Sequence, residues 1–81
     1  MSSENNVPEF IKRLQKEREE LSTKVDALDD FFETELFAGL SNYQQELLVQ
    51  QGDAMGEYLS ILSLQIDNEL QILKDNANAN A

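Results

Sequence analysis

Apolar side chains recur at intervals of three and four residues through the first half of the chain. The positions are Ile11, Leu14, Leu21, Val25, Leu28 and Phe32. This spacing places them on one face of an α-helix, because residues three and four apart lie above one another. Pro8 and Glu9 favour a helix start, since proline suits the first turn and an acid suits the positive helix end. We predict a first helix over residues 8–38, preceded by a flexible segment, 1–7.

The predicted end of this helix rests on Gly39, which can take the left-handed conformation that closes many helices. A turn over residues 39–41 would follow. In an alternative, the pairs Phe31–Phe32 and Leu36–Phe37 pack a separate short turn before Gly39.

A second helix is predicted over residues 42–74. Ser41 and Gln44 have the spacing of a capping box, in which each side chain bonds the other residue's backbone N–H at the helix start. The Asn- and Ala-rich segment 75–81 is too small and polar to bury much surface, so we expect a disordered tail.

Two apolar stripes run along the second helix. The first, the inner stripe, consists of Leu48, Gly52, Met55, Leu59, Leu62, Ile66 and Leu73. The second, the outer stripe, consists of Leu47, Gln51, Ala54, Tyr58, Ile61, Gln65 and Ile72. A short connection predicts an antiparallel, coiled-coil-like two-helix hairpin, in which one partner helix cannot cover both stripes. The predicted fold is therefore all-α, with hairpins assembling into a homo-oligomeric helical bundle.

Arg18 interrupts the apolar face of the first helix. A turn centred near Leu40 pairs Leu28 with Gly52 and sets Arg18 opposite Leu62. An unpaired arginine buried there would cost several kcal/mol. One interpretation has the apolar stem crossing the seam while the guanidinium reaches neighbouring acids. The other has Arg18 lining a polar cavity at a subunit interface.

The second interpretation defines a candidate ligand site. Gln51, Tyr58 and Gln65 are spaced by sevens, so their amide and phenol groups stack on one line of the second helix. Arg18 and Lys24 would supply positive charge for an anionic ligand, and Tyr58 would stack on a base. The alternative is a polar interface between chains.

Gly52 and Gly56 lie one turn apart in a helix interior, where each glycine costs about 1 kcal/mol relative to alanine. Small residues permit close approach of another helix or an aromatic ring, or form the floor of a ligand pocket. The oligomer interface is predicted at Leu47, Gly52, Ala54, Met55, Gly56, Tyr58 and Ile61.

Composition narrows the function classes. The chain has no cysteine and no histidine, which removes thiolate chemistry, the usual metal ligands and the usual general base near neutral pH. We expect no catalysis, no cofactor and no metal site; the acids between Asp26 and Glu35 are read as a solvated face. No segment has the roughly 18 apolar residues of a membrane span and no leader is evident, so a cytoplasmic protein is expected.

The net charge of −10 is concentrated in one part of the chain. The first 25 residues hold five acids and five bases, whereas Asp26 onward holds eleven acids and Lys74 as the one base. Such a field repels nucleic acid and attracts basic proteins. Direct nucleic-acid binding is therefore not expected.

The segment from Leu21 to Ile66 resembles a type of small accessory protein encoded by tailed bacteriophages. The residues that carry the resemblance are Glu20, Leu21, Lys24, Leu28, Phe32, Phe37, Leu40, Gln45, Leu47, Leu48, Gln51, Ala54, Met55, Tyr58, Ile61 and Leu62. In size and architecture the chain is also similar to helical phage proteins that inhibit bacterial defence. The resemblance implies an anti-defence role in the infected host cell.

Three functions follow as expectations. The first is an oligomeric sponge that sequesters a cyclic nucleotide or ADP-ribose-derived immune signal between helices. The second is an acidic nucleic-acid mimic that blocks a basic host protein. The third is a structural or assembly protein of the virion. The sponge is preferred because arginine, tyrosine and glutamines would converge at an oligomer interface, whereas the acids are scattered.

Overall fold

The structure is a computed structural model that describes residues 7–79, and it is helical throughout apart from short connections. Helix α1 spans Glu9–Phe31, α2 is a single turn at Glu35–Ala38, and α3 spans Asn42–Ala79. The predicted all-α class is confirmed. Residues 1–6 of the predicted flexible segment, and residues 80–81 of the predicted tail, lie outside the described residues.

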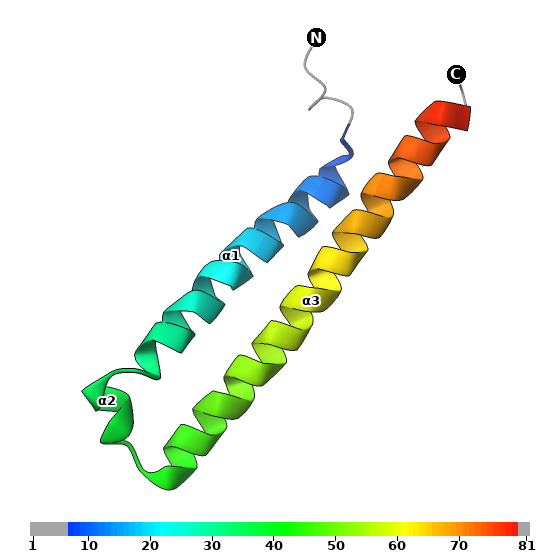
Figure 1. The fold of residues 1–81 in the computed structure, drawn as a ribbon. Helices are drawn as coiled ribbons and strands as arrows, with labels where there is room; N and C mark the ends of the chain where they lie inside the picture. Colours follow the sequence, from blue (N-terminus) through cyan, green and yellow to red (C-terminus); the bar gives the residue numbers. More distant parts are fainter. Residues whose placement is uncertain (1–6, 80–81) are drawn as a thin grey trace.

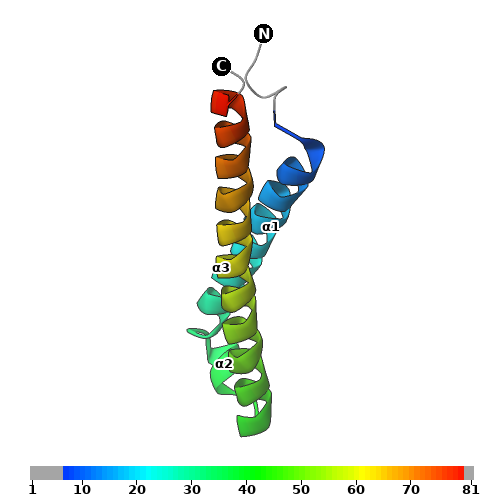
Figure 2. The ribbon, with the colours of Figure 1, turned by 90° about the vertical axis from the view of Figure 1, so that its right-hand side faces the viewer.

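Helices α1 and α3 lie side by side and run in opposite directions, with α2 at the corner between them (Figure 1). Viewed from the side, α1 crosses α3 at an angle (Figure 2). The molecule is an elongated rod of 60 × 21 × 16 Å. The start of α1 and the end of α3 lie at the same end of the rod.

The core lies along the line where α1 meets α3. Among the described residues, only Ile11, Leu62 and Ile66 are fully buried, each with 1% of its surface exposed. The other residues of the predicted apolar face, Leu14, Leu21, Val25, Leu28 and Phe32, and the rest of the inner stripe are half-buried, in agreement with the predicted faces. Every residue of the outer stripe is exposed. The expectation that α1 cannot cover both stripes is therefore confirmed.

The predicted pairing of Leu28 with Gly52 is also observed. A Cβ atom at Gly52 would lie 3.3 Å from Cδ2 of Leu28 and 3.5 Å from Cζ of Phe32. Hydrogen at this position lets the Phe32 ring approach the α3 backbone. The close approach of an aromatic ring thus occurs within one chain.

Helix α1 ends at Phe31, so the prediction that it continues to Ala38 is wrong. The Thr34 hydroxyl donates to the Phe31 carbonyl at 2.7 Å and accepts from the Phe37 N–H at 3.2 Å. Thr34 therefore caps a new helical turn. Threonine is more favourable at the N-cap of a helix than in a helix interior. The Phe37 ring packs edge-to-face on Phe31 and Phe32, with centroid distances of 6.0 and 5.0 Å. The alternative of a separate short turn is the arrangement observed.

Gly39 does not adopt the predicted left-handed conformation, since its φ is −83°. When a glycine takes the left-handed conformation, backbone N–H groups bond the last carbonyls of the helix. Here a side-chain amide bonds those carbonyls. The Gln45 amide donates to the carbonyls of Phe37 at 2.8 Å and Ala38 at 3.4 Å. Gln45 therefore ties the start of α3 to the end of α2.

The start of α3 agrees with the predicted capping box. The Ser41 N–H donates to Oε1 of Gln44 at 2.9 Å, and the Gln44 N–H donates to Oγ of Ser41 at 3.1 Å. At its other end α3 continues to Ala79, so the tail prediction is wrong for residues 75–79. Alanine has the highest helix propensity, and the Gln71 amide donates to Asp75 at 2.9 Å, one turn away.

Gly56→Ala is expected to raise the free energy of unfolding by about 1 kcal/mol, because alanine replaces the poorer helix former. A Cβ at Gly56 meets no atom within 4 Å in the described chain. Chemical denaturation followed by circular dichroism would measure the change. The matched variant Gly52→Ala should gain less, because its Cβ presses on Leu28; equal gains would contradict the tight packing at Gly52.

Candidate ligand-binding groove

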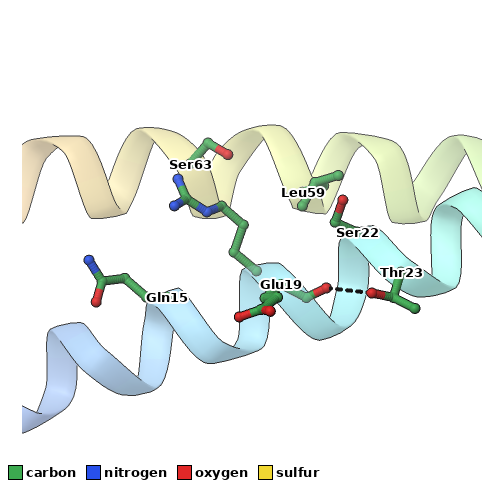
Figure 3. Close-up of a pocket in the computed structure, with 7 residues that line it drawn as sticks. Gln15, Glu19, Ser22, Thr23, Leu59 and Ser63 are labelled. Carbon is green, nitrogen blue, oxygen red and sulfur yellow. Dashed lines mark hydrogen bonds between the residues drawn. The ribbon is translucent and has the colours of Figure 1, made fainter.

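An open groove of about 620 Å³ runs between α1 and α3 on one side of their contact. Six of its seven lining residues are polar, and they come from the middle of both helices: Gln15, Arg18, Glu19, Ser22, Thr23, Leu59 and Ser63. Ser22 lies between the helices near Leu59, and Ser63 faces the groove from α3 (Figure 3).

Arg18 is the cation of this groove. Its side chain is half-buried, at the position where α1 lacks an apolar residue. Among residues 7–79, no side-chain nitrogen or oxygen is both fully buried and without a hydrogen-bond partner. The guanidinium group therefore retains contact with solvent in the groove, which removes most of the burial cost expected of an arginine at a seam.

Hydroxyl groups of Ser22, Thr23 and Ser63 surround the same space. The Thr23 hydroxyl donates to the Glu19 backbone carbonyl at 3.1 Å, which orients it on the helix (Figure 3). The other two hydroxyls can donate as well as accept. The groove thus combines one positive charge with small neutral donors.

These groups suit a ligand that carries both an anion and sugar hydroxyls. A guanidinium offers paired N–H donors that match phosphate oxygens. The Glu19 carboxylate accepts hydrogen bonds, so it suits a hydroxyl donor and repels a phosphate. A positive and a negative group that line the same groove would therefore orient such a ligand.

The structure does not bring the predicted ligand-site residues together within one chain. Arg18 lines the groove, but Lys24 is exposed on α1 outside it. Gln51, Tyr58 and Gln65 are exposed along the outer stripe and do not line the groove. Arg18 could meet Tyr58 and the glutamines only where two chains associate.

Tyr58 has a partner within the chain. Its hydroxyl donates to Oε2 of Glu17, which links α3 to α1. Successive residues of a helix point roughly 100° apart, so Glu17 and Arg18 project to different sides of α1. The hydrogen bond to Glu17, followed by desolvation and by the negative charge of Glu17, raises the pKa of Tyr58 above its usual 10.0.

We expect Tyr58 to ionise above its usual pKa, because the neutral phenol donates to Glu17 and phenolate cannot. The contribution to folding is complete below pH 10 and is lost as the pH rises through the folded-state pKa. A Tyr43→Phe background makes phenolate absorbance report Tyr58 alone. Glu17→Ala should lower the apparent pKa and Glu20→Ala should not; the same titration in all three would disprove the contact.

Residues assigned to the oligomer interface fall into two groups. Leu47, Tyr58 and Ile61 are 45%, 42% and 47% exposed, and Ala54 is exposed between them. Gly52 instead lies against α1 of the same chain. Met55 and Gly56 are half-buried. The exposed group forms the part of the interface that remains a prediction.

Sequence reasoning missed most of the groove. Gln15, Ser22, Thr23 and Ser63 were not selected, because polar residues beside a seam look like residues on a solvated face. Ser22 lies next to the seam residue Leu21, and Ser63 lies next to Leu62. Small hydroxyl residues that flank the seam on both helices were the available signal.

Among residues 7–79, no cluster of three or more acidic residues could hold a metal ion. Within the same residues, no helix combines the length and the apolar composition that a membrane span requires.

Comparison with known families gives a match to part of the chain. The family model described as Sequestin matches residues 8–68, which include α1, α2 and most of α3. No curated protein and no solved structure shows a significant match. The matched region contains every residue that lines the groove. The chain therefore belongs to the Sequestin family.

Proposed function

We propose that this protein is a non-catalytic, oligomeric sponge that sequesters a nucleotide immune signal in the cytoplasm of a phage-infected bacterium. Membership of the Sequestin family supports the sequestering role. The observation that carries the choice of ligand is Arg18, a half-buried cation in a groove lined by hydroxyl groups.

The proposed ligand is a cyclic nucleotide or an ADP-ribose derivative, both of which combine phosphate with sugar hydroxyls. Arg18 binds the phosphate, and Ser22 and Ser63 add neutral donors. Glu19 accepts from a ribose hydroxyl. Because the chain is strongly acidic, an anion binds only where a positive charge is fixed, and the groove holds one.

Outer-stripe residues enter this site from a second chain. Tyr58 can stack on a base, while Gln51 and Gln65 can read its edge with their amides. Lys24, outside the groove, attracts the anionic ligand electrostatically at longer range. The complete pocket therefore forms at the contact between subunits.

Calorimetric titration with a cyclic dinucleotide, a cyclic trinucleotide and an ADP-ribose derivative tests the proposal. At least one should bind, and heat denaturation should release it chemically unchanged. Arg18→Ala should weaken binding by about ten-fold or more, the usual effect of losing a charge-assisted hydrogen bond.

Arg13→Ala is the matched control, because it removes the same charge from an exposed position of α1. Its affinity should stay within about two-fold of the original chain. If none of the three ligands bound, the proposal would be overturned. Equal losses of affinity in Arg18→Ala and Arg13→Ala would show that Arg18 acts only through the net charge of the chain.

The acidity of α3 favours a second candidate, a mimic of nucleic acid. The helix carries six acids and one base, Lys74; the acids are Glu46, Asp53, Glu57, Asp67, Glu69 and Asp75. All but Glu69 are exposed. A basic host protein would bind this surface through charge, so the affinity would fall steeply with salt. Capture of DNA-binding proteins from bacterial lysate, in a salt-dependent way, would favour the mimic over the sponge.

A further inference from the structure

Two groups of opposite charge line the groove between α1 and α3. Arg18 and Glu19 are the charged members of its seven lining residues. Arg18 is half-buried, whereas Glu19 is exposed on the α1 side of the groove (Figure 3). The other lining residues are neutral. The lining is therefore neutral overall, within a chain whose net charge is −10.

This balance limits how much negative charge the groove can accept. The first negative charge that enters can pair with the Arg18 guanidinium. Any further charge meets the Glu19 carboxylate, and the lining residues that the structure describes contain no second cation. The acidic remainder of the chain adds to the repulsion. A ligand that concentrates negative charge on one phosphate is therefore disfavoured.

Phosphate groups differ in charge according to how they are esterified. A phosphodiester carries one negative charge, whereas a terminal phosphate carries about 1.5–2 at neutral pH. Cyclic nucleotides contain only diesters. In ADP-ribose both ends of the diphosphate are esterified, so each phosphate again carries one charge. Linear nucleotides such as ADP and ATP end in a terminal phosphate. The two ligand classes proposed above thus share the absence of a terminal phosphate.

We propose that Glu19 makes the groove selective for nucleotides without a terminal phosphate, because its carboxylate repels the additional charge of such a phosphate. This inference rests on the proposed function and narrows the class of nucleotide that the site takes. The same carboxylate accepts from a ribose hydroxyl, so it favours one class of ligand while it disfavours the other. Selectivity matters to a sponge, since nucleotides with terminal phosphates are abundant in every cell and compete for the groove.

Two pairs of ligands isolate the terminal phosphate. Cyclic diadenylate is compared with the linear diadenylate that forms when water cleaves one of its phosphodiester bonds, which leaves one hydroxyl and one terminal phosphate. ADP-ribose is compared with ADP, which lacks only the ribosyl group on the diphosphate. In calorimetric titration of the full chain, the member without a terminal phosphate should bind more tightly in at least one pair.

The variant Glu19→Gln removes the charge but keeps an acceptor for the ribose hydroxyl. It should shift the affinity ratio within that pair toward the ligand with the terminal phosphate by about five-fold or more, the effect of removing one charge near the ligand. Adding Arg18→Ala should abolish the gain, because the phosphate then has no cation to pair with.

Glu20→Gln is the matched control, because it removes the same charge from an exposed neighbour that does not line the groove. Its affinity ratio should stay within about two-fold of the ratio for the original chain. An unchanged ratio in Glu19→Gln, or the same shift in Glu20→Gln, overturns the proposed selectivity.

The titrations also separate the selectivity from the sponge function. If Glu19→Gln gains affinity for ADP or the linear diadenylate while neither cyclic diadenylate nor ADP-ribose binds the original chain, the selectivity stands and the sponge function fails. If cyclic diadenylate or ADP-ribose binds and the ratio does not change in Glu19→Gln, the sponge function stands and the selectivity fails. No binding of any of the four ligands to any variant overturns both.

Discussion

Replacing Leu62 with alanine is expected to lower the free energy of unfolding by about 2–5 kcal/mol, the usual effect of truncating a buried leucine. Leu62 is 1% exposed and is one of three fully buried side chains in the described molecule. Because so few residues form the core, a loss of this size is a large fraction of a small domain's stability. Urea unfolding at one fixed protein concentration would measure it.

Leu64 offers the matched control, two residues farther along the same helix. It is 68% exposed, so Leu64→Ala should change the free energy of unfolding by no more than about 0.5 kcal/mol. If Leu62→Ala lowered the free energy of unfolding as little as Leu64→Ala, Leu62 would not face the core.

The second large effect is expected at the corner, where Phe37→Ala should destabilise the chain by about 2 kcal/mol. Buried Phe→Ala changes cost roughly 3–5 kcal/mol, and Phe37 is half-buried. The variant also loses both edge-to-face contacts, with Phe31 and Phe32. Thermal unfolding followed by circular dichroism would measure the effect.

Leu36 precedes Phe37 in the same turn but is 74% exposed. Leu36→Ala should therefore unfold like the original chain. If Phe37→Ala were equally harmless, the aromatic cluster would not contribute to holding α2 in place.

The long helices could be predicted because their apolar spacing is regular. Seven-residue repetition fixed which residues face the partner helix, and the pairing of Leu28 with Gly52 followed from the position of the turn. The Ser41–Gln44 capping box was equally predictable, since its two hydrogen bonds depend only on local spacing.

The corner was harder, because local and longer-range interactions compete there. Glycine commonly ends a helix, yet α1 ends before Gly39, where Thr34 caps the next turn. The Gln45 amide then bonds the carbonyl of Phe37 at the end of that turn. The Gln45 contact joins two elements, so no local pattern reveals it. The helical end of α3 is not evident from composition, because an Asn- and Ala-rich segment is typical of a disordered tail although alanine itself favours helix.

Only the central residue of the groove could be anticipated. Arg18 is conspicuous because it breaks an apolar repeat, which is a property of the sequence alone. Ser22 and Ser63 become neighbours of the groove only through the rotation of each helix about its axis. Tyr58 was selected as a ligand residue, but its contact with Glu17 required knowing which side of α1 it faces.

The fixed corner has a consequence for how the chain folds. Leu28 and Gly52 meet after a short loop has closed, whereas Ile11 and Leu73, which share a small pocket at the open end, are far apart in the sequence. Loop closure costs more entropy as the loop grows, unless nearer contacts have already formed. We therefore expect the two helices to associate from the corner toward the open end, and to fray in the reverse order.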